Sequence, residues 1–394
     1  MKKAALIWGA SLAAALACGP AGAEDRFSID RFGGMEAPRV LPQLKSKQSP
    51  TAIVCATGGG QVALDARLAA CSSLIESGKW KGKEIGWAYA NRCAIYSAQG
   101  HDDKALGDCI QAISLDADSV IAYQIRGDIQ LTRGDSEKAL ADYDSGIQHG
   151  AHYAAIFIDR GNLLLAKGES EKALADFNQA LEINPDSTRA LVARGAARFT
   201  GGDFAPAIAD FDRAIELTPD NSLAWFNRGS AYFAKGDAAK AAENFKQALT
   251  LNPVNAYAAL WLFIASGDAN AKSELQAHTA KLSQKSWPWP VVQFYLGAKD
   301  GAQTIAAASN PAEQCEAQFY VGQERAMNRA TNEALPYLRK AVEICPKDFG
   351  ETIQAKSELI KLEAAPPKPE QPAAKPEPAD GKNAPADPAP DLKK

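Results

Sequence analysis

Small and large side chains recur along residues 86–255 with a fixed step of 34 positions. Four columns keep this step: Cys93, Gly127, Gly161, Gly195 and Gly229; Ala105, Ala139, Ala173, Ala207 and Ala241; Cys109, Tyr143, Phe177, Phe211 and Phe245; and Ala112, Gly146, Ala180, Ala214 and Ala248. Small residues let two helices approach closely, and the large residue fills the remaining gap. The pattern therefore predicts five two-helix units, at 86–119, 120–153, 154–187, 188–221 and 222–255.

Glycine and proline mark the expected ends of these helices. The glycines are Gly100, Gly134, Gly168, Gly202 and Gly236, and the prolines that close three units are Pro185, Pro219 and Pro253. Glycine ends a helix because it tolerates a left-handed conformation. A 34-residue period with this spacing resembles the tetratricopeptide repeat (TPR). The resemblance implies an all-α TPR solenoid of antiparallel helix hairpins, which is a binding scaffold.

The rest of the chain divides around this block. We expect an irregular lead-in at 24–47, a degenerate disulfide-stapled first repeat at 48–85, an irregular helical section at 256–314, a last TPR-like repeat with a closing helix at 315–363, and a disordered tail at 364–394. The tail is rich in proline and alanine and has no aromatic residue, so it cannot bury a core.

Residues 1–23 are typical of an export signal. Lys2 and Lys3 precede an apolar run that ends at Ala17, and Ala21-Gly22-Ala23 resembles a cleavage site. We expect cleavage after Ala23 and a periplasmic protein. The competing interpretation is an outer-membrane lipoprotein anchored through Cys18, because the residues before this cysteine resemble a lipobox. Membrane attachment is expected only if Cys18 is lipidated.

The overall charge argues against one class of partner. The formal net charge is −4, and no basic block precedes the tail. Nucleic-acid binding requires clustered lysine and arginine to neutralise phosphates. We therefore expect protein partners and no nucleic acid.

The six cysteines of the mature chain fit one geometric rule. They are Cys55, Cys71, Cys93, Cys109, Cys315 and Cys345. Residues of a helix hairpin face each other when the sum of their positions within the repeat has a constant value. The repeat positions of Cys93 and Cys109 sum to 32, and so do those of Cys315 and Cys345. Cys55 and Cys71 are separated by the same number of residues as Cys93 and Cys109. The rule predicts three disulfides, Cys55–Cys71, Cys93–Cys109 and Cys315–Cys345. Alternatively, the cysteines are small residues that only fill packing positions.

An arginine occupies position 7 of every unit. The column is Arg92, Arg126, Arg160, Arg194 and Arg228, and position 23 holds Asp108, Asp142, Asp176, Asp210 and Asn244. The arginines could form a ladder for an anionic ligand. The matching acids favour a brace between the two helices of each unit, because arginine pairs with a carboxylate in a bidentate manner.

No pattern of catalytic residues is found in the sequence. It has no G-x-S-x-G, H-E-x-x-H or G-x-G-x-x-G pattern. His149 and His152 are three residues apart at a helix end, but no third metal ligand is close in sequence. We expect no enzymatic activity, no cofactor and no metal.

Partner binding is expected on the concave face, which the first helices of the units line. The candidate partner-binding residues are Ile121, Leu131, Ile158, Asn162, Leu165, Val192, Phe199, Phe226 and Phe233. A largely apolar groove suits an amphipathic helix or an extended segment. Some of these side chains are alternatively expected to pack on neighbouring helices.

Two segments resemble a more specific family. Trp287–Gly297 reads Trp-Pro-Trp-Pro-Val-Val-Gln-Phe-Tyr-Leu-Gly and Gln318–Gly322 reads Gln-Phe-Tyr-Val-Gly. Both resemble segments of the new lipoprotein I (NlpI) family of periplasmic TPR lipoproteins. That resemblance implies a homodimeric adaptor that brings a tail-specific protease to cell-wall hydrolases and scaffolds murein enzymes. The weak lipobox, the cysteines and the proline-rich tail depart from the family.

Three hypotheses follow. The first is a periplasmic adaptor that binds envelope proteins, among them a protease or peptidoglycan hydrolases, through its concave face. The second is a small-ligand-binding or enzymatic role of section 256–314, which requires a polar pocket around Trp287 and Trp289 with a histidine or a carboxylate pair. The third is a structural role, either as a lipid-anchored outer-membrane protein or with the tail contacting the cell wall.

Overall fold

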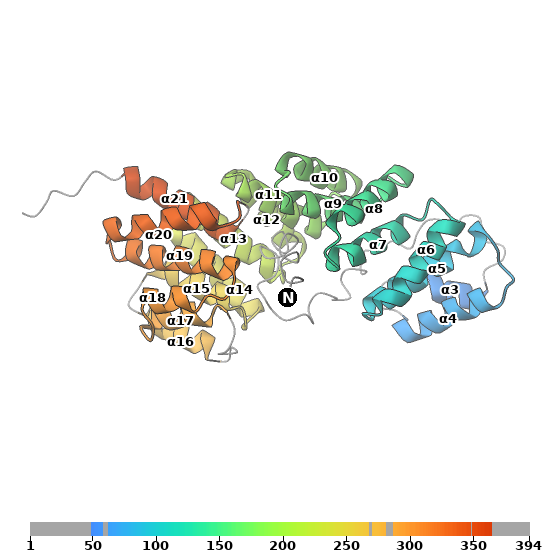
Figure 1. Ribbon diagram of the computed structural model, residues 1–394, viewed down its shortest axis with the longest axis horizontal. Helices are drawn as coiled ribbons and strands as arrows, with labels where there is room; N and C mark the ends of the chain where they lie inside the picture. The colour runs from blue at the N-terminus through green and yellow to red at the C-terminus, as the bar shows by residue number, and fades with distance from the viewer. Residues whose placement is uncertain (1–48, 58–61, 268–269, 281–286, 348, 365–394) are drawn as a thin grey trace, which may run out of the picture.

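The structure is a computed structural model that describes residues 49–57, 62–267, 270–280, 287–347 and 349–364. These residues form helices and no strand. The expected signal peptide, the whole lead-in at 24–47 and the tail after residue 364 lie outside the described residues. The helices follow one another as an array of hairpins that arches across the molecule (Figure 1).

The described helices are α3 (Pro50–Ala56), α4 (Leu64–Glu76), α5 (Lys83–Ala98), α6 (Asp102–Leu115), α7 (Val120–Thr132), α8 (Ser136–His149), α9 (Ala154–Ala166), α10 (Ser170–Ile183), α11 (Thr188–Thr200), α12 (Phe204–Leu217), α13 (Ser222–Lys235), α14 (Ala238–Leu251), α15 (Ala256–Ser266), α16 (Ala271–Thr279), α17 (Trp289–Leu296), α18 (Gly301–Ala306), α19 (Pro311–Met327), α20 (Thr331–Ile344) and α21 (Gly350–Ala364). The five repeats are the pairs α5/α6, α7/α8, α9/α10, α11/α12 and α13/α14.

Residue size sets how closely the two helices of a repeat approach. Phe177 and Phe211 are fully buried, each against the glycine of its own repeat. A Cβ atom on Gly161 or Gly195 would lie 2.6 Å from the ring of that phenylalanine. Only glycine therefore fits opposite the aromatic ring, which explains the repeating small and large positions of the sequence.

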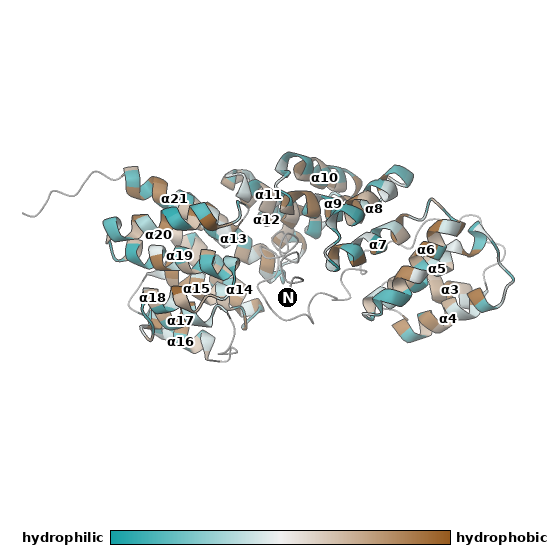
Figure 2. Ribbon diagram, viewed as in Figure 1, coloured by the Kyte–Doolittle hydropathy of each residue, from teal (hydrophilic) through white to brown (hydrophobic). Residues whose placement is uncertain are grey.

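The first helices of the repeats form the inner, concave side of the array. Each of them contacts the first helix of the next repeat, along the series α5, α7, α9, α11 and α13, whereas successive second helices make at most slight contact. Neighbouring elements of a curved array lie closest on its inside, so these first helices line the concave face. Apolar residues concentrate on α9 in the middle of the array (Figure 2).

The arginine column is a brace, as its matching acids indicated. Bidentate pairs join the two helices in four repeats, with N–O distances of 2.6–3.0 Å: Arg92–Asp108, Arg126–Asp142, Arg160–Asp176 and Arg194–Asp210. The fifth, Arg228, donates to Asn244 Oδ1 at 2.7 Å. The brace also reaches the preceding repeat, since Arg160 donates to Asp144 at 2.7 Å. The arginines are therefore committed to internal contacts and do not form an anion-binding ladder.

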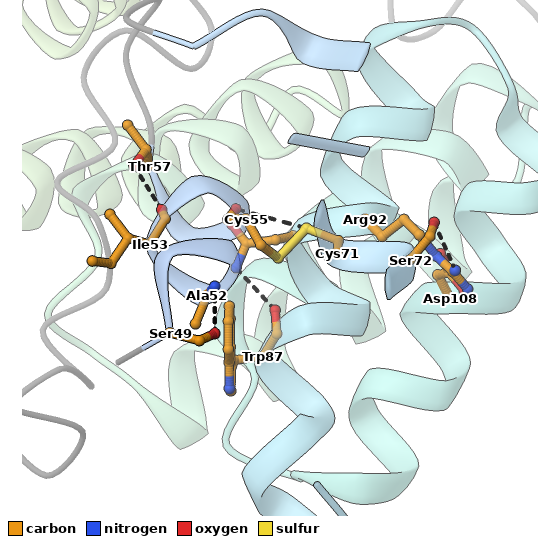
Figure 3. Close-up of a disulfide and its surroundings, with 11 residues drawn as sticks. Ser49, Ala52, Ile53, Cys55, Thr57, Cys71, Ser72, Trp87, Arg92 and Asp108 are labelled. Carbon is orange, nitrogen blue, oxygen red and sulfur yellow. Dashed lines mark hydrogen bonds and ion pairs between the residues drawn. A yellow bond between two sulfur atoms is a disulfide. The ribbon is translucent and has the colours of Figure 1, made fainter. Parts of the chain in front are cut away.

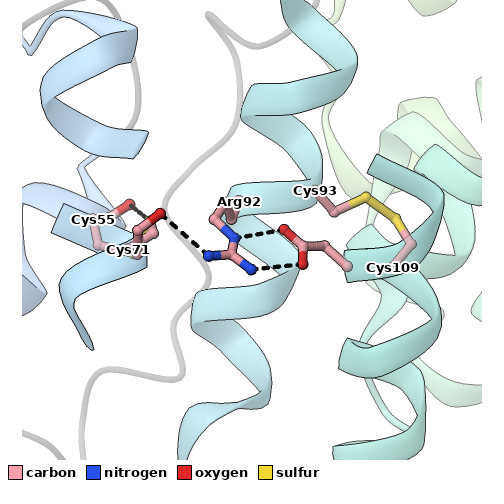
Figure 4. A network of polar contacts seen from close by, with 7 residues as sticks. Cys55, Cys71, Arg92, Cys93 and Cys109 are labelled. Carbon is pink, nitrogen blue, oxygen red and sulfur yellow. Dashed lines mark hydrogen bonds and ion pairs between the residues drawn. A yellow bond between two sulfur atoms is a disulfide. The ribbon is translucent and has the colours of Figure 1, made fainter. Parts of the chain in front are cut away.

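Three disulfides join the cysteines in the pairs that the register rule predicts. Their Cα–Cα distances are 4.9 Å for Cys55–Cys71, 5.4 Å for Cys93–Cys109 and 5.0 Å for Cys315–Cys345. The first bond joins α3 to α4 (Figure 3), and the second lies beside the Arg92–Asp108 pair (Figure 4). The third joins α19 to Cys345, which directly follows α20. Each bond staples one helix hairpin and typically contributes about 2–4 kcal/mol.

The section after residue 255 departs from the repeat and folds back on itself. Trp261 of α15 is its centre, with the rings of Phe233, Phe245, Phe319 and Tyr320 at centroid distances of 5.3–6.2 Å. These rings come from α13, α14 and α19, so the last repeat is held by the same core as the fifth. Helix α17 begins at Trp289, with Pro290 in its first turn, where proline needs no amide hydrogen.

Candidate binding groove

The nine candidate residues of the concave face lie in two different environments. Ile158, Leu165, Val192 and Phe199 are buried in the central core, with 2–7% of their surface exposed. They form the body of the array rather than a surface for a partner. These four follow the alternative that the sequence left open, in which side chains pack on neighbouring helices, since the first helices contact one another.

The other five candidates are partly exposed. Ile121 and Leu131 pack against the cores of the first and central repeats, and Phe226 and Phe233 pack against the aromatic core around Trp261. Asn162 lies on α9 in the middle of the array. These five residues therefore mark two parts of the concave face, one over α7 and α9 and the other over α13.

A polar ladder crosses the first of these parts. Gln124 on α7 donates to Asp159 Oδ2 on α9 at 2.5 Å, and Arg189 on α11 donates to Asp159 Oδ1. Asp159 is only 5% exposed, so its charge is satisfied by these two neighbours. The ladder joins three successive repeats on their inner side. Sequence reasoning missed Asp159, although an acidic residue directly after the apolar residues 156–158 was a signal of a buried polar contact.

The second part of the concave face is covered by the chain's own last helix. Helix α21 contacts α13 and α11 in addition to α19 and α20. Gln354 Nε2 donates to the carbonyl of Ser230 and Ser357 Oγ donates to the carbonyl of Ala234, both at 2.8 Å. Because α11 and α13 are inner helices, α21 lies on the concave side and beside α13 in Figure 1.

A buried carboxyl group anchors the base of α21. Glu316 on α19 is 8% exposed and accepts two hydrogen bonds at its Oε2 atom. Trp287 Nε1 donates at 2.7 Å and Tyr257 OH donates at 3.0 Å. A second carboxyl group, Glu351 of α21, is held through Tyr320 OH at 3.4 Å. The cluster joins α15, the segment before α17, α19 and α21.

The surroundings of this cluster raise the pKa of both of its carboxyl groups. Burial, reinforced by the charge of Glu351, raises the pKa of Glu316 to about 8, against the lowering effect of the Trp287 and Tyr257 bonds. Burial also raises the pKa of Glu351. Two carboxyl groups in one apolar site cannot easily ionise together. The cluster is therefore neutral or singly charged near neutral pH.

A carboxyl pair beside Trp287 is the feature that the enzymatic hypothesis requires. In the structure, however, Glu316 faces the core, and its Oε2 atom already accepts from Tyr257 and Trp287. A carboxyl group held in this way fixes the packing of helices and has little contact with solvent. The pair therefore lends the enzymatic hypothesis no support.

The described residues offer no metal site of three or more histidine, cysteine, aspartate or glutamate ligands. His149 contacts Asp118 Oδ1 at 3.1 Å and stacks on Tyr123, so it takes part in helix-end contacts. Within the same described ranges, no helix has both the length and the apolar character needed to cross a membrane.

The comparison with family models agrees with this architecture. The tetratricopeptide repeat family model matches residues 158–222 and 193–256. A comparison with proteins of curated function gave no match. Among solved structures, the chain is similar to YrrB, described as a TPR protein with an unusual peptide-binding site, at 23% identity over 48% of this chain and 95% of that one, with a TM-score of 0.40.

Two further solved structures, PilF and PilW, are similar to this chain. PilF of Pseudomonas aeruginosa has 15% identity over 54% of this chain and 97% of its own, with a TM-score of 0.49. PilW, a type IV pilus biogenesis factor, has 20% identity over 55% of this chain and 98% of its own, with a TM-score of 0.47. These likenesses concern the fold alone.

The repeats, their internal packing and the family match define the molecule as an all-α TPR solenoid. The class acts as a scaffold for contacts between proteins, because each repeat adds one helix to a continuous inner surface. The inner surface of this solenoid has an accessible part over α7 and α9 and a part over α11 and α13 that α21 occupies.

Proposed function

We propose that the chain is an exported, non-enzymatic adaptor that binds envelope proteins on its concave face. The observation that carries this proposal is the inner surface of α7 and α9. No described element other than the neighbouring repeats packs closely on these two helices, and Asn162 is partly exposed there. A protein segment that binds between Ile121 and Leu131 would find apolar contacts beside polar ones.

An extracytoplasmic location is part of the same proposal. Three disulfides within one chain suit an oxidising compartment such as the periplasm. The charged and apolar pattern of residues 1–23 is typical of an export signal. The resemblance to the NlpI family adds the suggestion that the partners include a protease or peptidoglycan hydrolases and that the adaptor is a homodimer. Lipidation of Cys18 would add a membrane anchor.

Substitution of Asn162 by arginine is the test of the groove. Asn162→Arg places a long charged side chain on the inner face of α9, so we expect at least tenfold less partner protein to copurify from envelope extract. The measurement is quantitative mass spectrometry of proteins retained by the immobilised full chain. The matched control is Ala175→Arg, because Ala175 is exposed on the outer helix α10. Equal recovery with both variants and wild type would argue against the groove.

A further inference from the structure

The contacts of α21 resemble those of a bound ligand. Its partners on α13 are 123 and 124 residues away in the sequence. Gln354 meets Ser230, and Ser357, one turn later on α21, meets Ala234, one turn later on α13. The helix thus lies along the concave face as a helical peptide from another chain would lie.

Small residues allow this close approach. Ser230 and Ala234 line the contact on α13, while Ala355 and Ser357 belong to α21. Because these side chains are short, the donors of α21 reach backbone carbonyls of α13. Backbone carbonyl groups of α13 therefore accept hydrogen bonds from side-chain donors at defined positions of the docked helix.

The face of α21 that enters the groove has a defined chemical character. Ile353 joins the apolar core of the central repeats, and Gln354 beside it is 3% exposed. Further along, Lys361 Nζ lies 5.5 Å from the centroid of the Phe233 ring, a cation–π contact. Along α21, the groups that contact the groove are an aliphatic residue, an amide donor, a hydroxyl donor one turn later and a basic residue after another turn.

The docked arrangement leaves a polar atom of α21 unsatisfied. Gln354 is 3% exposed, and its Oε1 atom has no hydrogen-bond partner among the described residues. A buried polar group without a partner weakens the state that buries it.

We propose that the groove over α11 and α13 is a recognition site for an amphipathic helix of a partner protein, and that α21 is a resident ligand which that helix displaces. This proposal rests on the proposed adaptor function and adds a second binding site to it. The partner helix carries the same order of groups as α21. A side chain that leaves no unpaired amide oxygen at the position of Gln354 would favour the partner helix over α21.

Competition between α21 and a free helix gives the proposal a measurable consequence. While α21 is docked, the groove is available only in the small fraction of molecules whose α21 has left it, and the apparent affinity falls by that fraction. Weakening α21 within the chain must therefore strengthen binding of a helix added from outside. The loss of two hydrogen bonds changes the equilibrium constant for docking of α21, and with it the apparent affinity for an added helix, by about tenfold.

The experiment uses a fluorescent peptide with the sequence of residues 349–364 and the full chain. Fluorescence anisotropy is measured with wild type, with Gln354→Ala/Ser357→Ala, and with Lys356→Ala. Lys356 is exposed on α21, so its variant is the matched control. We expect the double variant to bind the peptide about tenfold more tightly than wild type and the control to bind as wild type does. Circular dichroism checks that all three chains keep the same helical content.

Several results would overturn the proposal. Equal peptide affinity for wild type and the double variant would mean that α21 does not compete for the groove. Conversion of the double variant into a dimer, measured by light scattering, would assign the groove to α21 of a second copy. If the peptide does not bind while Asn162→Arg still loses its partners, the adaptor function stands and the α21 site does not. If the double variant binds the peptide more tightly while Asn162→Arg keeps every partner, the α21 site stands and the proposed binding surface over α9 is rejected.

Discussion

Replacement of Arg126 by methionine is expected to lower the free energy of unfolding by about 3–5 kcal/mol. Arg126 makes a bidentate pair with Asp142, at 2.6 and 2.9 Å, and Asp142 is only 5% exposed. The variant leaves this carboxylate buried without its cationic partner, and a buried uncompensated charge is strongly destabilising. Urea denaturation followed by circular dichroism measures the loss.

Two further variants separate the brace from an ordinary surface pair. Arg126→Met/Asp142→Leu removes both charges, so it should recover most of the lost stability. Arg133→Met removes a pair with Asp103, whose side chain is 95% exposed, and should cost at most about 1 kcal/mol. Similar losses for Arg126→Met and Arg133→Met would show that the arginine column does not brace the hairpins.

Substitution of Glu316 by glutamine is expected to remove a pH dependence of stability. The folded protein holds a proton on Glu316 up to a pKa of about 8, against 4.5 as the ordinary value of a glutamate. Between about pH 5 and 8 the unfolded chain binds fewer protons here than the folded one. Stability must therefore fall as pH rises, by about 1.4 kcal/mol per pH unit and up to roughly 4 kcal/mol in total.

Glutamine keeps the contacts of Glu316 without its titration. Its amide oxygen can accept from Trp287 Nε1 and Tyr257 OH as the carboxyl does. The remaining titratable groups that face the site are Glu351, Glu313, Tyr257 and Tyr320. We expect the variant to match wild type near pH 5 and to be the more stable protein at pH 8, with Glu351 leaving a remaining slope of the same sign.

Urea denaturation at several pH values measures this difference. The matched control is Glu182→Gln, because Glu182 is exposed on α10 and should leave the pH profile of wild type unchanged. A wild-type profile that is flat from pH 5 to 8, or one that Glu316→Gln does not alter, would mean that the carboxyl group ionises normally in the folded protein.

Periodicity and register predicted the repetitive part of the molecule. The 34-residue step places the glycine of each repeat opposite its aromatic ring, and the same step pairs Arg126 with Asp142 and Cys93 with Cys109. Such contacts lie within one hairpin, where the distance along the sequence is fixed by the repeat. Residue size and charge are then sufficient to identify them.

The contacts that shape the concave face are of another kind. Gln354 meets Ser230 across 124 residues, and Glu316 meets Tyr257 across 59. Neither separation is a feature of the repeat, because both depend on how the irregular section turns the last repeat back towards the fifth. The sequence therefore predicted an open apolar groove, whereas α21 covers one part of it and mutual packing buries Val192 and Phe199.

The central claim is that partner proteins bind on the inner side of the solenoid. Site-specific photocrosslinking tests it most directly, with a photoreactive amino acid placed at Asn162 on α9 or at Ala175 on α10. We predict crosslinks to a partner from position 162 and none from position 175 when the full chain is irradiated in envelope extract. Crosslinks that form only from position 175, or equally from both, would contradict the claim.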